Sequence, residues 1–226
     1  MQRVPTGSKA FDQLLDGGFE TDVVTTIYGP SGSGKTNVCL LAAITTARSS
    51  KVIYIDTEGG ASTQRLLQLT SGNPGLADNI LFLKPTCFKE QAELFNRLKD
   101  LVNERVGMII VDTISMLYRA ELGKEVYDTN KVLGRQLSYL VEIARKRNIP
   151  VLIASQVYSD FDDKDNYKVV GGDIITYSSK CLILLRNKEK GIKRATLVRH
   201  RSLPERSIEF VIKQKGLEKK GLFTQT

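Results

Sequence analysis

The chain has 226 residues, of which 41% are hydrophobic, enough for one complete α/β core. Its three cysteines are scattered and form no Cys-x-x-Cys pair, which indicates reduced, buried thiols rather than a disulfide framework or a zinc site. No run of about 18 apolar residues and no N-terminal signal core is present, so we expect a cytoplasmic protein without a membrane partner.

The first long apolar strand leads into a phosphate-binding loop. Helical spacing of apolar residues at 8–16 and 36–48 flanks the strand-like run at 23–28. After this strand comes a complete Walker A motif, made of Gly29, Pro30, Ser31, Gly32, Ser33, Gly34, Lys35 and Thr36. Its glycines let backbone N–H groups point at a phosphate, Lys35 supplies a cation, and the Thr36 hydroxyl can bind Mg²⁺. We therefore expect ATP and Mg²⁺ as ligands.

Two later strands end in carboxylates. Glu58 follows the predicted strand 51–56, where a carboxylate can orient or deprotonate the water that attacks a γ-phosphate; the alternative is a surface loop acid. Helices are then predicted at 62–70 and 88–105, with a strand at 79–83. The strand 107–112 ends at Asp112 in a Walker B arrangement, which orients Mg²⁺ through its water shell.

A polar amide ends the next strand. A helix is predicted at 129–147 and a strand at 149–155, followed by Gln156, which could contact the γ-phosphate and report hydrolysis to the following segment. Short apolar strands alternating with helices are typical of a mostly parallel sheet buried on both faces. No repeat or low-complexity linker divides the chain, so we expect one domain over residues 1–226.

The end of the chain is basic. Strands predicted at 180–186, 194–199 and 207–212 lack long intervening helices, so we expect antiparallel strands at the sheet edge. Residues 186–220 hold 12 Lys or Arg against four Glu, and the rest of the chain is balanced at 21 of each sign. Such a segment favours contact with a polyanion, and the candidate DNA contacts are Arg194, Arg199 and Arg201. The alternative is a solvated hairpin. His200 is expected to belong to this strand end rather than to a catalytic pair.

Several segments together resemble the RecA-like core of archaeal and eukaryotic recombinases. They occur in order and cover nearly the whole chain, at 6–21, 54–59, 110–119, 154–157, 171–175 and 203–205. The resemblance implies a RecA-like P-loop ATPase fold in which Glu58, Lys35 and Gln156 are catalytic, Gln156 acting as nucleotide sensor, and Arg65 packs on the adenine. The segments after Arg119 and Gln156 correspond to two DNA-binding loops, which adds as candidate DNA contacts Arg119, Lys124, Tyr158 and Lys168.

The chain also departs from the full recombinases. It has no room for their helix-hairpin-helix N-terminal domain or polymerisation motif, a shortness that resembles the archaeal RadB paralogues. Residues 157–168 hold four Asp against two Lys, which would repel a phosphate backbone, although Tyr158, Phe161 and Tyr167 could stack on bases. Arg199 stands where the recombinases have an aspartate that caps ATP across a subunit interface.

Our leading hypothesis is an accessory ATPase of DNA repair and homologous recombination. It would bind ATP, Mg²⁺ and single- or double-stranded DNA, hydrolyse slowly, and assist the main recombinase or a junction resolvase, with a homo-oligomer as one expected state. One alternative is a nucleotide-dependent adaptor with little DNA affinity. Another is a KaiC-like ATPase or a P-loop kinase.

Overall fold

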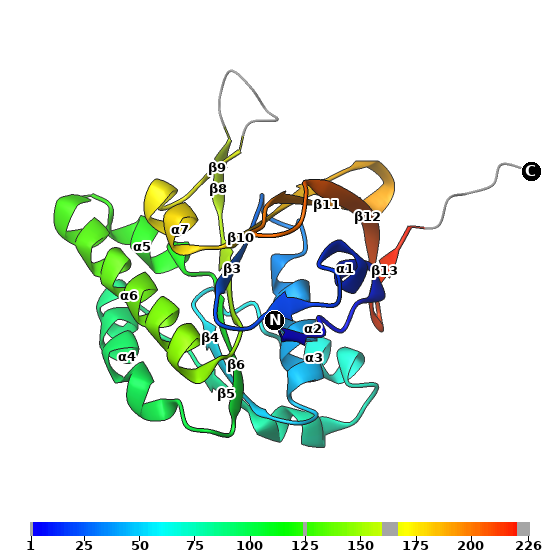
Figure 1. Cartoon of the computed structure of the whole chain (residues 1–226), viewed down its shortest axis with the longest axis horizontal. Coiled ribbons are helices and arrows are strands. Elements are labelled where there is room, and N and C mark those ends of the chain that lie inside the picture. The colour runs from blue at the N-terminus through cyan, green and yellow to red at the C-terminus, as the bar shows by residue number, and fades with distance from the viewer. Residues whose placement is uncertain (1, 124–125, 160–166, 221–226) are drawn as a thin grey trace, which may run out of the picture.

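A central nine-stranded sheet organises the chain (Figure 1). The computed structural model describes residues 2–123, 126–159 and 167–220. The strand order is β13-β12-β11-β10-β3-β7-β6-β4-β5. The strands are β3 (Val24–Tyr28), β4 (Lys51–Asp56), β5 (Ile80–Leu83), β6 (Val106–Asp112), β7 (Val151–Ser155), β10 (Cys181–Asn187), β11 (Ile192–Arg199), β12 (Arg206–Lys213) and β13 (Gly216–Lys219).

The sheet has a parallel part and an antiparallel part. Strands β10, β3, β7, β6, β4 and β5 run parallel to one another, and β11, β12 and β13 extend the sheet beyond β10 in antiparallel fashion. The prediction of a mostly parallel sheet with antiparallel C-terminal strands is therefore confirmed. Asp56 and Asp112 lie directly opposite each other at the carboxyl ends of β4 and β6.

Helices form a layer on each face of the sheet (Figure 1). One layer contains α1 (Lys9–Leu14), α2 (Lys35–Thr46) and α3 (Thr63–Leu69), and the other contains α4 (Phe88–Leu101), α5 (Ser115–Glu121), α6 (Val126–Arg147) and α7 (Gly172–Ser178). A separate apolar cluster fills the space on each side. None of the described helices is long and apolar enough to cross a membrane.

Several elements differ from the sequence prediction. The first helix is shorter, because Asp16 and Gly17 adopt positive φ angles of 55° and 117° that end it. The unpredicted elements are α5, α7, β13, the pair β1 (Arg3–Val4) and β2 (Phe19–Glu20), the pair β8 (Val157–Ser159) and β9 (Tyr167–Val169), and the 3₁₀ turns Pro74–Asn79 and Glu189–Gly191. Cys87 is exposed, contrary to the expectation that the thiols are buried, whereas Cys39 and Cys181 are buried and all three are free.

Candidate nucleotide-binding site

The phosphate loop joins β3 to α2 at the carboxyl edge of the sheet. A side chain at position 29 could not fit, because its Cβ would lie 2.3 Å from the carbonyl oxygen of Leu185. Gly34 precedes α2 with φ at 104°, and no side chain caps the first turn of the helix. The backbone N–H groups at this helix start are therefore left for an anion.

Lys35 is folded over its own loop. Its ammonium donates to the carbonyl oxygens of Gly29 at 2.9 Å and Pro30 at 3.0 Å. Burial lowers the pKa of Lys35, while the nearby Glu58 and Asp112 carboxylates oppose that effect. The buried Ser33 Oγ has no hydrogen-bond partner among the described residues. These donors fit a polyphosphate, whose oxygens would satisfy them.

Asp112 and Thr36 come together as a potential Mg²⁺ site. Asp112 ends β6 only 1% exposed, and the Tyr54 hydroxyl donates to its Oδ2 at 2.8 Å. Burial raises the pKa of Asp112, and hydrogen bonds from Tyr54 and Thr36 oppose that rise. No group of three or more His, Cys, Asp or Glu in the described ranges could hold a metal ion alone. One hydroxyl and one carboxylate instead suit a Mg²⁺ ion that keeps waters and phosphate oxygens.

Asp56 is a site residue that the sequence analysis missed. It is 2% exposed and accepts hydrogen bonds from the backbone N–H groups of Gly60 at 3.1 Å and Ala61 at 3.2 Å. These bonds fold the turn that carries Glu58. The signal in the sequence was an Asp at a strand end followed by two glycines, a pattern typical of side-chain to backbone bonding.

Glu58 and Gln156 meet above the phosphate loop. Gln156 Nε2 donates to Glu58 Oε1 at 2.7 Å and lies 3.4 Å from Met116 Sδ. The backbone N–H of Gln156 donates to Ser115 Oγ at 3.0 Å, which fixes the end of β7 against α5. A cavity of about 450 Å³ lies here, with Glu58, Gln156 and most of the phosphate loop in its wall. The structure therefore brings the four residues Lys35, Thr36, Glu58 and Gln156 to one cavity.

Comparison with known proteins identifies the family. Residues 1–220 match the family model described as Rad51. The chain belongs to the Rad51 family. It is 41% identical over 224 residues to the DNA repair and recombination protein RadB of Methanobrevibacter smithii, covering 95% of each chain. It is 39% identical over 221 residues to the protein of that name from Methanococcoides burtonii, covering 96% of this chain and 97% of the relative.

A solved structure shows the same fold. The crystal structure of the RadB recombinase superposes with a TM-score of 0.83 at 37% sequence identity, covering 96% of this chain and 100% of that one. The RecA-like fold and the resemblance to archaeal RadB proteins, both expected from the sequence, are thereby confirmed.

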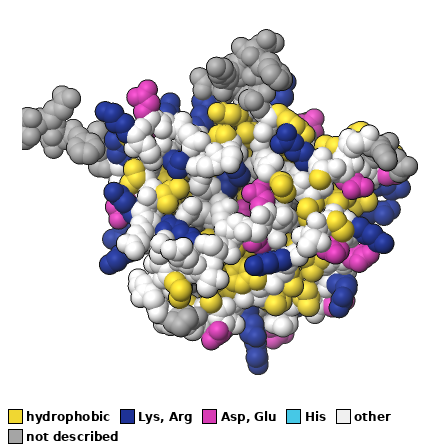
Figure 2. All heavy atoms as spheres, turned by 180° about the vertical axis from the view of Figure 1, so that it is seen from behind, with side chains coloured by type: hydrophobic (Ala, Val, Ile, Leu, Met, Phe, Trp, Pro, Cys, Tyr) yellow, Lys and Arg dark blue, Asp and Glu magenta, His cyan; other side chains and the backbone are white. Residues whose placement is uncertain are grey.

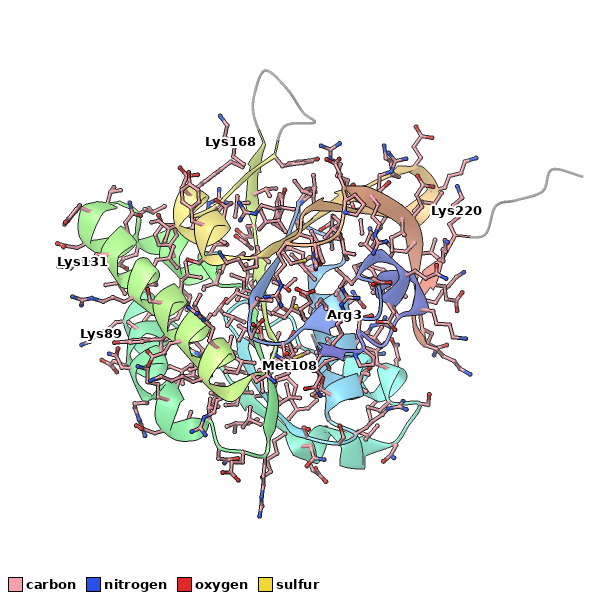
Figure 3. The ribbon with its side chains drawn as sticks, in the orientation of Figure 1. Arg3, Lys89, Met108, Lys131, Lys168 and Lys220 are labelled. Carbon is pink, nitrogen blue, oxygen red and sulfur yellow. The ribbon has the colours of Figure 1, made fainter. Side chains whose placement is uncertain are left out.

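Arg119 of this Rad51-family chain lies beside the phosphate loop. It lines the same cavity as the phosphate loop, although we expected it to be a DNA contact. Its guanidinium lies over the ring of Tyr158, 5.3 Å from the centroid. Tyr158 is 41% exposed, and Lys168 projects outward from β9 (Figure 3). Lys124, the other candidate in these segments, lies outside the described residues.

Arg65 is held away from the cavity wall by its own contacts. Its Nε donates to Asn37 Oδ1 at 2.7 Å, and its two terminal nitrogens donate to the carbonyl oxygens of Lys213 and Gln214 at 3.0 Å. Partial burial lowers the pKa of Arg65. The side chain thus joins α3 to the turn between β12 and β13, and its expected packing on adenine stays a prediction.

The three arginines expected to contact DNA near the end of the Rad51-family core, Arg194, Arg199 and Arg201, each contact other parts of the protein. Arg194 pairs with Glu209 at 2.9 Å. Arg201 pairs with Glu20 at 2.6 Å and with Asp22 at 3.0 Å. On the face seen in Figure 2, Lys and Arg side chains are spread over the surface among acidic and uncharged ones.

Arg199 and His200 are also engaged at the end of β11. Arg199 donates to the carbonyl oxygens of Thr176 and Ser179, which caps the C-terminus of α7. His200 Nδ1 accepts from the backbone N–H of Ser202 at 3.1 Å, and burial lowers the pKa of the imidazole. The histidine therefore belongs to the turn after β11, at the strand end where it was expected.

Proposed function

We propose that the chain is an accessory ATPase of DNA repair and homologous recombination, formed by one RecA-like domain over residues 1–226. The observation that carries the nucleotide part is the 2.7 Å hydrogen bond between Gln156 and Glu58 directly beside the phosphate loop. The relatives named DNA repair and recombination protein RadB support the process in which we place it.

Different residues at this site would bind the nucleotide and promote its hydrolysis. Lys35 and the loop N–H groups would bind the phosphates of ATP, and Thr36 together with Asp112, through water, would hold Mg²⁺. When bound, Mg²⁺ neutralises negative charge on the phosphate oxygens. Glu58 would orient the attacking water and accept its proton.

The Gln156 amide explains why hydrolysis would be slow. While it donates to Glu58, the carboxylate is occupied and is a weaker acceptor for a proton from water. A γ-phosphate would offer the Gln156 amide a second acceptor. The amide could then donate its hydrogen bond to the nucleotide in place of Glu58. That exchange would pass the state of the nucleotide to β8, which begins at the next residue.

The same strand end carries the proposed DNA contacts. Tyr158 and Lys168 lie on the paired strands β8 and β9, and Arg119 lies over Tyr158. Aromatic and basic side chains of this kind bind single strands by stacking and charge. We place Arg194, Arg199 and Arg201 second as DNA contacts, because each already makes an ion pair or a helix cap. We further propose that the protein assists the main recombinase or a junction resolvase and does not exchange strands unaided.

The test measures nucleotide and DNA binding separately. We expect Lys35→Ala to abolish ATP binding and hydrolysis, and we expect DNA retention across a salt series to change when ATP is added to the wild type. Strand exchange should require the main recombinase, with a faster rate when this protein is present. Unaided strand exchange on long ATP-dependent filaments would show that the protein is itself a recombinase.

The ion pairs of the basic arginines favour a second function, a nucleotide-dependent adaptor with little DNA affinity. Charge reversal at these arginines would also break their structural contacts, so we test direct DNA binding at Lys168, which pairs with Tyr158 in the register of β8 and β9. Lys168→Glu should weaken DNA retention if the chain binds DNA directly, whereas Lys89→Glu on α4 is the matched control (Figure 3). Equal DNA retention in both variants, with loss of recombinase contact in Lys168→Glu, would support the adaptor.

A further inference from the structure

The end of β10 lies along the phosphate loop. The loop begins so close to this strand that a Cβ at position 29 would lie 2.3 Å from the carbonyl oxygen of Leu185. Two residues further along β10, Asn187 Nδ2 donates to the carbonyl oxygen of Ser31 at 3.2 Å. A side chain that lies 156 residues after Ser31 in the sequence therefore bonds directly to the backbone of the nucleotide motif.

Lys193 holds the Asn187 amide in this orientation. The two residues face each other across the antiparallel pair of β10 and β11. Lys193 Nζ donates to Asn187 Oδ1 at 2.8 Å, so the amide presents its oxygen to the lysine and its nitrogen to Ser31. Because an ammonium group only donates and a carbonyl oxygen only accepts, the amide cannot turn over without losing both bonds.

The alkyl chain of Lys193 passes the start of α2. Ala195 and Leu197 follow Lys193 at every second position of β11, and both are buried in the apolar cluster on the α2 side of the sheet. Lys193 points to that side as well, since its Cδ lies 3.6 Å from the place of a Cβ on Gly34. The lysine is therefore confined between the sheet and the start of the helix.

The bond from Asn187 determines where the next N–H group points. The peptide unit of Ser31 and Gly32 is trans, so its carbonyl and its N–H point in opposite directions. Both residues line the nucleotide cavity, and the Gly32 N–H has no hydrogen-bond partner among the described residues. While Asn187 binds the carbonyl, the N–H is directed away from β10 and is left for a phosphate oxygen.

Gly32 would let this peptide unit rotate if the bond were absent. Its φ is 70°, and a Cβ there would meet nothing within 4 Å, so neither the backbone preference nor the surroundings fix the unit. The carbonyls of Gly29 and Pro30 are bound by Lys35 instead. Lys35 would leave them to bind the phosphates, whereas Asn187 can keep its bond when the nucleotide enters.

We propose that Asn187 and Lys193 are positioning residues for the nucleotide, which together hold the Ser31–Gly32 peptide unit so that its N–H donates to a phosphate of ATP or ADP. This inference rests on the proposed function and adds two residues outside the Walker motifs. Neither side chain is part of the wall of the nucleotide cavity. Lys193 acts on the nucleotide through the orientation of the Asn187 amide, so both residues affect nucleotide affinity and not the rate of hydrolysis at saturation.

Binding of fluorescent ATP and ADP analogues, together with steady-state hydrolysis, tests the proposal. Asn187→Leu keeps the size of the side chain and loses both bonds. It should raise both dissociation constants about 2- to 10-fold, the range for one hydrogen bond, with kcat unchanged. Lys193→Met should have a similar effect, and Lys193→Gln, which can still donate to Asn187, should recover most of the affinity. Lys188→Gln is the control, since it removes a positive charge from an exposed position next to Asn187.

The Gly32 amide signal tests the orientation directly. Labelling serine carbonyls with ¹³C and glycine nitrogens with ¹⁵N selects the amides of Gly32, Gly34 and Gly72, because only these glycines follow a serine. When ADP binds to the wild type, the Gly32 amide proton should move downfield as it bonds to phosphate, while Gly72, in the turn after α3, stays in place. In Asn187→Leu saturated with ADP the Gly32 shift should be smaller, which a purely structural role of Asn187 would not produce.

The possible outcomes distinguish this proposal from the proposed function. If Lys35→Ala abolished nucleotide binding but Asn187→Leu and Lys193→Met bound ATP and ADP like wild type, this proposal alone would be overturned. Equal losses in Lys193→Gln and Lys193→Met would show that the lysine acts by its charge, contrary to the proposal. A wild type that bound no nucleotide would overturn the proposed function as well. Unfolding midpoints without nucleotide verify folding, and the two Lys193 variants carry the test if Asn187→Leu does not fold.

Discussion

At the scale of single residues, the nucleotide cavity contains a carboxylate that is already bound by a neighbour. Glu58 is exposed, but the Gln156 amide lies 2.7 Å from its Oε1. Asp112 is its opposite, a fully buried carboxylate supported by Tyr54. Substitution of Glu58 should therefore change mainly the rate of hydrolysis. Substitution of Asp112 should change the free energy of unfolding of the protein without ligand.

Glu58→Gln should leave ATP affinity nearly unchanged and reduce hydrolysis about 100-fold or more, because the variant keeps a polar contact with Gln156 and loses the proton acceptor. Single-turnover assays with radiolabelled ATP measure the rate, and binding of a fluorescent ATP analogue measures affinity. An unchanged rate would assign the proton to another group.

Asp112→Asn should stabilise the protein without ligand at neutral pH. Since burial raises the pKa of Asp112 in the folded state above its ordinary value of 3.8, ionisation of this group costs stability as the pH rises above that value. The difference between Asp112→Asn and wild type should vanish in more acidic buffer. Urea unfolding at several pH values measures it, with the exposed Asp100→Asn as control. If Asp112→Asn were less stable than wild type at neutral pH, ionisation of the buried Asp112 would not be the cost that we infer.

At the scale of elements, long-range ion pairs join the two ends of the chain. Arg201 follows β11, yet it holds Glu20 of β2, whose side chain is 2% exposed, and Arg3 of β1 approaches the same carboxylate at 3.5 Å. The basic segment after β11 therefore holds the N-terminal strand pair against the end of that strand.

Arg201→Ala should lower the free energy of unfolding by about 1–3 kcal/mol, because the buried Glu20 loses its closest partner and keeps Arg3. Urea denaturation measures this loss, and Lys188→Ala, at an exposed position, is the control. DNA retention of the folded Arg201→Ala variant should fall less than that of Lys168→Glu, because we place Arg201 second among the DNA contacts. A larger loss of DNA binding in Arg201→Ala, with normal stability, would place Arg201 first among the DNA contacts.

The long elements were predictable because their signal is local. The apolar strands β4, β6 and β7 and the helices α2, α4 and α6 occur close to their expected bounds. Helices α5 and α7 were missed because seven residues cannot hold a helix alone, and tertiary contacts such as Tyr118 to Asn130 at 2.5 Å stabilise them. The two-residue strands β1 and β2 pair across the chain without any local pattern.

The same distinction applies to the candidate site. Glu58, Asp112 and Gln156 could be proposed from the sequence because the ends of parallel strands meet at one edge of a sheet, and the structure places Glu58 and Gln156 in one cavity wall. The place of Arg119 in the cavity depends on how α5 leaves β6, which the sequence pattern did not indicate. The partners of Arg194 and Arg201 lie on other strands, so their ion pairs could only be seen in three dimensions.

At the scale of the whole molecule, ligand binding and folding are linked through the phosphate loop. ATP with Mg²⁺ at 100 times its dissociation constant should add about 2.7 kcal/mol of stability, which raises the unfolding midpoint by about 5–10 °C for a chain of this size. Differential scanning fluorimetry measures the shift. Lys35→Ala should remove it, and an unchanged shift in that variant would place the nucleotide elsewhere.

The position of β3 in the strand order has a consequence for synthesis. This strand pairs with β7 on one side and β10 on the other, so both of its neighbours are translated long after it. During synthesis from the N-terminus, β3 keeps two unpaired edges until residue 151 and then one until residue 181. The phosphate loop at 29–36 is therefore completed late, and a nascent chain that stops before β10 would carry the nucleotide motif without a formed pocket.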